Sequence, residues 1–244
     1  VAISLLSAVA ECSPREIQEN VMRKAIACLV VMVVLVPTLA QSQVLQNIHI
    51  NTSDTARYLE WAENSMPIIV RDSQIPSSGG VCVPTFGAQE EGDVYVYTIA
   101  QDFESLMTID LTSPVTAREI AKIAPHRTVK ARDLWSSVRR SPNVNINAGD
   151  TFSMLTLAVS TGQPDMYLTQ LEAMEDGMHE AGHRDVNFLV AQVMTGEFRN
   201  HLSVRMMAPT PERLGAAMDT MQTATWARNI INNLASIRTV SQQM

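Results

Sequence analysis

The segment with the clearest potential for chemistry is His179-Glu180-Ala181-Gly182-His183. Its spacing matches H-E-x-x-H, in which two histidines one helical turn apart bind zinc and the glutamate activates a water molecule. A hydrolytic zinc centre would also need a third ligand and an open coordination position. Glu197 and His201 are the downstream candidates, although both fall in or beside a predicted turn.

The context of this motif favours a helix end over a metal site. Gly182 stands where a C-terminal helix cap is expected, and Arg184-Asp185 precede a predicted strand. A metal-binding histidine pair needs a helix that continues through both ligands, whereas histidines near a helix C-terminus are favoured by the helix dipole. We therefore expect a solvated helix end, no metal and no cofactor; a structural metal and a zinc hydrolase remain as alternatives.

A second set of candidates follows from strand parity, because alternate residues of a strand point to opposite faces. One face should pack on helices through Val44, Ile48, Val94, Val96, Leu155, Leu157, Leu202 and Val204. The opposite face carries Asn47, His49, Tyr95, Tyr97, Met154, Thr156, Ser203, Arg205 and Met207. If two sheets meet there, apolar bodies with a few polar groups enclose a ligand pocket.

The favoured interpretation of this face is a sheet interface without a pocket, in which Arg205 pairs with a carboxylate or packs against a tyrosine ring. The alternative is a pocket for a small apolar molecule, for which the candidate ligand-binding residues are His49, Tyr95, Tyr97, Ser203 and Arg205. A satisfied sheet histidine is favoured over a general base at His49. Cys82, in an apolar setting, is expected to be a buried small residue and not a nucleophile.

The elements that position these residues are clearest in the second half, residues 151–244. Alternation and helical spacing predict strand Phe152–Val159, helix Asp165–Ala181, strand Val186–Met194, turn Thr195–Asn200, strand His201–Ala208, a last helix opened by Pro209–Pro211 and continuing through Leu234, and a closing strand at Ile237–Val240. The expected apolar stripe of the first of these helices is Met166, Leu168, Leu171, Met174 and Met178.

The first half, residues 43–140, has the same order of elements. The predicted series is strand Gln43–Asn51, a helix opened by Thr52-Ser53-Asp54, a strand in Val81–Ala88, strand Asp93–Ala100, helical pieces in Phe103–Ile123 interrupted at Ser113-Pro114, and Thr128–Val138, for which a strand is favoured over a helix. The first helix should bury Ala56, Leu59, Ala62, Met66 and Ile69, and Pro67 should kink or end it. The polar segment Ser141–Asp150 separates the halves.

Each half therefore reads β-α-β-β-α-β, which predicts an α+β fold of two ferredoxin-like halves whose antiparallel sheets pack as an α/β barrel. The segment AGHRDVNFLVAQVMTGEFRNHLSVRM, with strand and helix before it and a helix after it, resembles the dimeric α/β-barrel superfamily, including antibiotic-biosynthesis-monooxygenase-like and NIPSNAP-like domains. The residues that carry the resemblance are Ala181-Gly182, Gly196 in the turn, and Trp226, expected late in the last helix.

The resemblance implies a barrel, here duplicated in one chain, and the binding of small apolar molecules; a homodimer is compatible with it. The first functional hypothesis is an exported small-molecule-binding or stress-associated protein. The alternative is a cofactor-independent, monooxygenase-like enzyme acting on a small apolar substrate. A net charge of −7 argues against a nucleic-acid partner, because phosphates attract surplus lysine and arginine.

The segment Met22–Ala40 has the form of a secretory signal peptide. Met22-Arg23-Lys24 is a basic start, Ala25–Pro37 is an apolar run of signal length, and Ala40 is a small residue at the expected cleavage position. An uncleaved anchor, a buried helix and a lipoprotein signal at Cys28 are the alternatives. We expect residues 1–21 to be an upstream extension, the mature protein to be periplasmic or secreted, and no membrane association after signal removal.

Overall fold

The computed structural model describes residues 43–141 and 149–243. The expected extension at 1–21 and signal peptide at 22–40 lie outside the described residues, as does most of the expected boundary at 141–150. No helix within the described ranges is long and apolar enough to cross a membrane.

The first half contains four strands and three helices. Their bounds are β1 Val44–Thr52, α2 Thr55–Ser73, β2 Ser77–Cys82, β3 Asp93–Ala100, α3 Phe103–Met107, α4 Pro114–Ala121 and β4 Arg127–Arg139, with a short 3-10 turn, η1, at Ala124–His126 before β4. The predicted start signals act as expected: the Asp54 carboxylate accepts the Arg57 amide at the start of α2. Ser113 caps α4, which has Pro114 in its first turn.

The second half repeats this series of strands and helices. Its bounds are β5 Ser153–Thr161, α5 Pro164–Glu180, β6 Asn187–Val193, β7 Leu202–Ala208, α6 Pro211–Thr223, α7 Thr225–Ile237 and β8 Arg238–Gln243. Helix α5 ends as predicted, with Ala181 as the cap and Gly182 at a φ of +96°, a conformation that favours glycine.

All eight strands described form one antiparallel sheet in the order β2-β3-β1-β4-β6-β7-β5-β8. The first four strands have the ferredoxin-like order, and the last four repeat it. The halves are joined by the pairing of β4 with β6, in which Trp135 lies opposite Val193. The predicted α+β class and the two ferredoxin-like halves are therefore confirmed.

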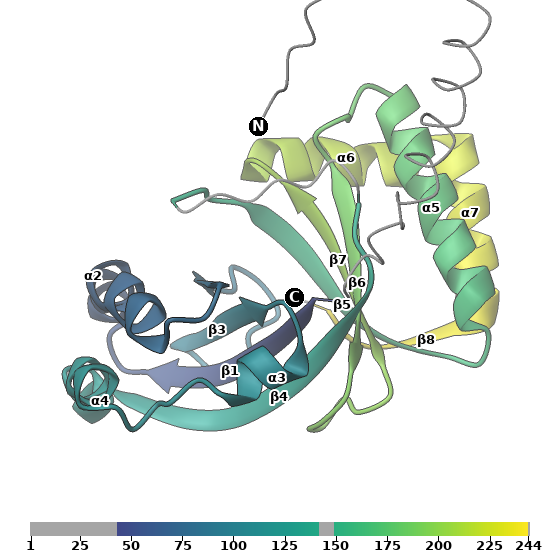
Figure 1. Ribbon diagram of the computed structural model, residues 1–244. Helices are drawn as coiled ribbons and strands as arrows, with labels where there is room; N and C mark the ends of the chain where they lie inside the picture. Colours follow the sequence, from purple (N-terminus) through teal and green to yellow (C-terminus); the bar gives the residue numbers. More distant parts are fainter. Residues whose placement is uncertain (1–42, 142–148, 244) are drawn as a thin grey trace, which may run out of the picture. The chain divides into compact units, whose positions relative to one another are not determined.

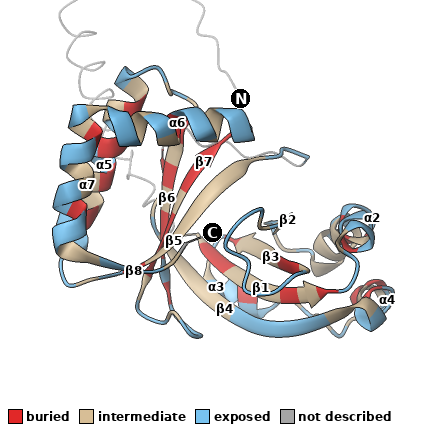
Figure 2. Ribbon diagram, turned by 180° about the vertical axis from the view of Figure 1, so that it is seen from behind, coloured by how far each residue is buried: buried red, intermediate tan, exposed pale blue. Residues whose placement is uncertain are grey.

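Helices cover one face of each half of the sheet, with α2 and α4 beside the first and α5, α6 and α7 beside the second (Figure 1). The apolar strand residues predicted to meet helices do so. Val94 and Ile50 pack with Tyr58 of α2 in the first half. In the second half, Val204 and Val159 belong to a larger core with Leu171 of α5. Figure 2 shows the buried residues running along the strands of both halves.

Several boundaries differ from the sequence predictions. Strand β2 begins and ends earlier than the predicted Val81–Ala88, because Pro84 has no N–H to donate to a neighbouring strand. The glycines before Pro84 can instead lie close to Tyr97, where a Cβ on Gly80 would clash with the tyrosine hydroxyl. Helix α2 continues past Pro67 to Ser73. The single last helix is two helices, because Ala224 has an extended ψ of 131°. Trp226 therefore lies near the start of α7.

Two helices are also rotated relative to the predicted stripes. In α2 the buried residues are Tyr58, Ala62 and Ser65, whereas Leu59 is 40% exposed. In α5, Tyr167 takes the place expected for Met166, which is 52% exposed. In both helices a tyrosine at the fourth helical position is buried, a preference that the hydrophobic pattern alone did not reveal.

The contact between α5 and α7 predicts opposite effects for two helical glycines. A Cβ on Gly177 would stand 2.4 Å from the Trp226 ring, so Gly177→Ala should lower the free energy of unfolding by about 1–2 kcal/mol, as overpacking does. A Cβ on Gly215 of α6 meets nothing within 4 Å, so Gly215→Ala should raise it by about 0.5–1 kcal/mol through helix propensity. Urea unfolding measures both; equal shifts would contradict the described helix contact.

Candidate functional site

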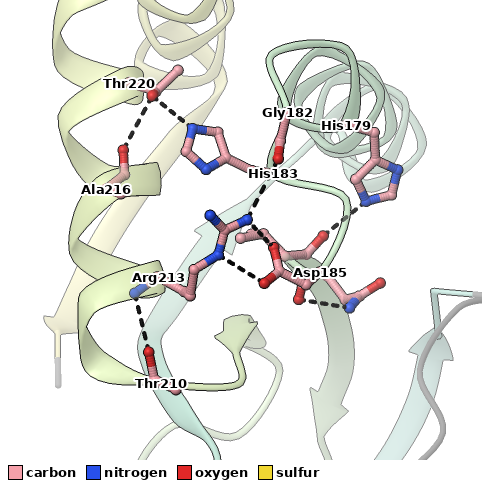
Figure 3. A network of polar contacts seen from close by, with 10 residues as sticks. His179, Gly182, His183, Asp185, Thr210, Arg213, Ala216 and Thr220 are labelled. Atoms are coloured by element: carbon pink, nitrogen blue, oxygen red, sulfur yellow. Dashed lines mark hydrogen bonds and ion pairs between the residues drawn. The ribbon is translucent and has the colours of Figure 1, made fainter.

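The two histidines of the H-E-x-x-H segment are held apart by structural hydrogen bonds (Figure 3). The Nε2 atom of His179 lies 2.9 Å from the Val186 carbonyl, at the turn into β6. The Nε2 atom of His183 lies 2.8 Å from the Thr220 hydroxyl of α6. No group of three or more histidine, cysteine, aspartate or glutamate side chains suited to a metal ion occurs in the described ranges.

An ion pair secures the same helix end. The Arg213 guanidinium donates to both Asp185 oxygens, at 2.8 Å and 2.6 Å (Figure 3). These hydrogen bonds hold the pKa of the Asp185 carboxyl below its ordinary value. The segment therefore ends α5, as its sequence context favoured, but it is not the solvated end that we expected: His179 and His183 are half-buried and hydrogen-bonded, and the segment ties α5 to α6.

The predicted ligand set lies on the face of the sheet that turns away from the helices. His49 and Tyr95 stack with ring centroids 4.7 Å apart, and the Nε2 atom of His49 lies 3.0 Å from Asp93. Ser203 is buried, and its hydroxyl has no hydrogen-bond partner among the described residues. The structure thus places these side chains on one face, while their role in ligand binding remains a prediction.

Arg205 shows that the sheet curls over this face. Its guanidinium lies 4.4 Å from the ring centroid of Trp135, two strands away in the sheet, so its aromatic partner is a tryptophan and not the tyrosine considered from sequence. Desolvation lowers the pKa of Arg205 to about 10, while nearby Cys82 and Tyr97 act in the opposite direction. Because β2 and β3 are far from β7 in strand order, this proximity reaches across the curled sheet.

Burial raises the pKa values of two further side chains on this face, Cys82 and Tyr95. Burial raises the pKa of the Cys82 thiol to about 11, partly opposed by Arg205. Burial also raises the pKa of Tyr95 to about 12. Cys82 is half-buried and not fully buried as expected, and the raised pKa of its thiol disfavours the thiolate at neutral pH.

A cavity lies on the other face, between the sheet and the helices of the first half. It has a volume of about 130 Å³ and is bounded by α2, α3, α4 and strands β1 and β3. Its wall is mainly apolar and includes Ile48, Ile50, Val96, Leu106, Ile109 and Ile120. This volume is close to the roughly 150 Å³ of an apolar cavity that takes up benzene, so a ligand with one ring would fit.

Hydrogen bonds between α2 and α4 keep this cavity from closing. The Trp61 indole donates to the Glu119 carbonyl at 2.8 Å, and the Ser65 hydroxyl donates to the Glu119 carboxylate at 2.9 Å. Further along α2, Asp72 accepts from Ser113 and Thr116. Because these bonds set the separation of the helices, the space above β1 and β3 is not filled by apolar side chains.

Three side chains form a polar end to the cavity. Tyr58 is 0% exposed, and its hydroxyl has no hydrogen-bond partner with good geometry among the described residues. The guanidinium of Arg127 lies 5.8 Å from the Trp61 ring centroid and close enough to Tyr58 to affect its pKa, which desolvation nevertheless raises. The site therefore offers a hydroxyl donor and a cation at one end of an apolar chamber.

The second half contains an equivalent tyrosine and arginine, but side chains fill most of the space beside them. Tyr167 stands at the fourth position of α5, as Tyr58 does in α2, and Arg238 begins β8 as Arg127 begins β4. Here the Arg238 guanidinium donates to the Tyr167 hydroxyl at 3.0 Å. The corresponding space is only about 40 Å³, with Met174, Phe188 and Met206 in its wall.

The strand ends are fixed by one hydrogen bond in each half. The Thr52 hydroxyl donates to the His126 carbonyl and the Thr161 hydroxyl to the Ile237 carbonyl, both at 2.7 Å. Sequence reasoning missed Tyr58, Trp61 and Arg127 as site residues. The signal that could have revealed two of them is the repetition of Arg-Thr-Val at 127–129 and 238–240 and of Tyr-Leu at 58–59 and 167–168.

Comparisons with known proteins give the fold. No family model and no curated protein matches the sequence. A proposed monooxygenase from Fusobacterium nucleatum superposes with a TM-score of 0.58 at 7% identity, covering 84% of this chain and 91% of that one. A proposed monooxygenase from Lactobacillus acidophilus gives 0.56 at 9% identity, with coverages of 83% and 91%.

An anthrone oxidase-like protein gives a TM-score of 0.51 at 13% identity, covering 84% of this chain and 92% of that one. Together these neighbours place the chain in the fold class of the dimeric α/β barrels, as the resemblance implied. Identities this low establish the fold and leave the reaction open.

The ion pair at the end of α5 predicts a pH dependence of stability. Because the folded pKa of Asp185 is depressed, the pair stabilises the fold above the ordinary carboxyl pKa of about 3.9 and loses this effect as pH falls through the folded value. Arg213→Met should therefore lower the free energy of unfolding slightly at pH 7, where the pair is half-exposed, and leave it almost unchanged near pH 2.

Urea unfolding at both pH values measures the effect. Arg184→Met, which removes an exposed arginine next to Asp185 with no ion pair in the described ranges, is the matched control. An equal loss for the two variants at pH 7 would contradict the assignment.

Proposed function

We propose that the protein binds a small, largely apolar molecule in the cavity between α2, α4 and the sheet of the first half. The observation that carries the proposal is the cavity itself, about 130 Å³ with a mainly apolar wall, whose lining also includes the buried Tyr58 and the cation Arg127. A bound apolar molecule would make dispersion contacts with a wall that otherwise lacks partner atoms.

The hydrogen bonds between α2 and α4 support this function because they make the site preformed. A chamber whose walls do not need to separate on binding loses less affinity to reorganisation. Apolar walls with a few polar groups at one end are also the usual composition of small-molecule sites. The proposed ligand site therefore lies on the helix-covered face of the sheet, whereas the candidate ligand-binding residues drawn from the sequence lie on the opposite face.

We also propose that the two halves arose by duplication of one ferredoxin-like unit. The support is the repeated set of Thr52, Tyr58 and Arg127 with Thr161, Tyr167 and Arg238, each in the same position of its half. One copy kept an open chamber and the other became core. A single chain would then supply both sheets that the resemblance assigns to two subunits.

A bulky substitution inside the chamber tests ligand binding. Val96→Phe places a ring where a ligand would sit, and it should weaken binding of para-fluorobenzyl alcohol at least about tenfold, in line with steric loss of most contacts. Fluorine NMR titration of the full chain measures the dissociation constant. Val138→Phe, at a residue that is 45% exposed and outside the cavity, is the control. Unchanged binding in Val96→Phe would refute the site.

A second candidate is a cofactor-independent oxygenase acting on a molecule in the same chamber. It is favoured by the names of the two proposed monooxygenases with this fold. An enzyme of this kind consumes dioxygen when its substrate is bound, whereas a binding protein does not. Oxygen uptake in the presence of ligands found by the titration, compared between the native protein and Val96→Phe, separates the two functions.

We further propose that the protein is exported through the signal-like segment Met22–Ala40. Cell fractionation should recover the protein outside the cytoplasm with its N-terminus at Gln41. Val31→Asp, which places a charge in the apolar run, should retain it in the cytoplasm as an uncleaved chain. Recovery of uncleaved native protein in the cytoplasm would disprove export.

A further inference from the structure

We infer that the molecule bound in this chamber is an apolar carboxylic acid, with its carboxylate held by Arg127 and Tyr58. The inference rests on the proposed ligand-binding function and adds the chemical class of the ligand. It is carried by two arginines without an ion pair in the described ranges, Arg127 and Arg132, and by the buried Tyr58 next to Arg127, all of which line a mainly apolar cavity.

The cation at this end is not neutralised by the protein. Arg127 forms no ion pair with any carboxylate in the described ranges, and neither does Arg132, which also lines the cavity. No aspartate or glutamate is among the described residues that line the cavity, and two acids of the surrounding helices have other partners: Asp72 accepts from Ser113 and Thr116, and Glu119 accepts from Ser65 and pairs with Lys122. An entering anion therefore meets positive charge without a competing carboxylate.

The guanidinium is also held in position before a ligand arrives. It lies over the Trp61 ring, and that ring is fixed by the indole hydrogen bond to the Glu119 carbonyl. The backbone just before Arg127 is fixed by Thr52, whose hydroxyl donates to the His126 carbonyl. A positioned arginine fork binds the two oxygens of a carboxylate without much loss of side-chain freedom.

The second half contains the counterpart of the Tyr58–Arg127 pair, next to a much smaller space. Arg238 donates to the Tyr167 hydroxyl oxygen beside a space of about 40 Å³, and the Tyr167 proton takes no part in this bond. In the first half Arg127 likewise interacts with the Tyr58 hydroxyl, but the cavity beside this pair is about 130 Å³. The two halves therefore differ in the space beside the pair, and only the first half leaves room for a ligand whose carboxylate would accept from Arg127 and from the Tyr58 hydroxyl.

The chemistry of the hydroxyl fits a carboxylate acceptor. Desolvation raises the pKa of Tyr58 above its ordinary value, an effect that outweighs the influence of Arg127, so the hydroxyl stays protonated and can donate. Arg127 supplies the opposite charge, and the apolar walls take up the body of the ligand. A single ring or a short branched chain bearing one carboxylate matches the size and polarity of the chamber.

Two probes of equal size test the inference. Fluorine NMR titration of the full chain with para-fluorobenzoate and para-fluorobenzyl alcohol should give at least about tenfold tighter binding of the acid, the gain expected for a charge-assisted pair. Arg127→Met should bring the acid to the level of the alcohol and leave the alcohol within about twofold. Tyr58→Phe should weaken the acid about fivefold, as loss of one hydrogen bond does.

Arg238→Met is the matched control, because it removes the equivalent arginine of the filled half and should change neither dissociation constant. Inorganic phosphate, an anion without an apolar body, should not compete with the acid. If Arg127→Met does not fold, the salt dependence of the native protein tests the same point. Raising the salt concentration from about 50 to about 500 mM should raise the dissociation constant of the acid, because salt screens its attraction to Arg127, and should leave that of the alcohol unchanged.

The outcomes separate the two levels of the proposal. Binding of neither probe overturns the ligand-binding function itself. Equal binding of acid and alcohol, with no effect of Arg127→Met, overturns the recognition of a carboxylate and leaves the cavity function standing. Competition by phosphate alone would assign the arginine to a general anion site and overturn the apolar acid.

Discussion

The pairing of β4 with β6 is the constraint on which the rest of the structure depends. A ferredoxin-like sheet has helices on one face only, and its other face would be exposed to water. Joining the two half-sheets edge to edge extends the antiparallel ladder to eight strands and lets it curl, so that Arg205 of one half lies near Tyr97 and Cys82 of the other. The polar face thereby becomes an interior without a second layer of helices.

The two halves use one architecture for different purposes. In each, a threonine at the end of the first strand fixes the start of the fourth, and an arginine at that start approaches a buried tyrosine of the first helix. The second half fills the space above its sheet with Met174, Phe188 and Met206 and becomes the main core. The first half spaces its helices with hydrogen bonds to Glu119 and Asp72 and keeps an open chamber.

Sequence patterns predicted most of the fold but not the cavity. Strand β3 coincides with the alternating segment Asp93–Ala100, and the strand favoured at Thr128–Val138 lies within β4. Alternation in a half-buried strand and proline or aspartate at helix starts are local signals, so they survive without tertiary information. Tyr58 was missed because a hydrophobic stripe drawn through Leu59 describes the helix almost as well, and burial of a tyrosine depends on its partners across the sheet.

The sequence by itself determined the order of the strands, the capped starts of α2 and α4 and the face that each strand residue occupies, because these follow from backbone geometry over a few residues. It also predicted that His179-Glu180-Ala181-Gly182-His183 ends a helix, and the positive φ of Gly182 in the structure confirms this. Only the tertiary structure decided which half is filled and which is hollow. That difference depends on hydrogen bonds such as Trp61 to Glu119, between residues 58 positions apart, and no local pattern encodes the distance they impose between two helices.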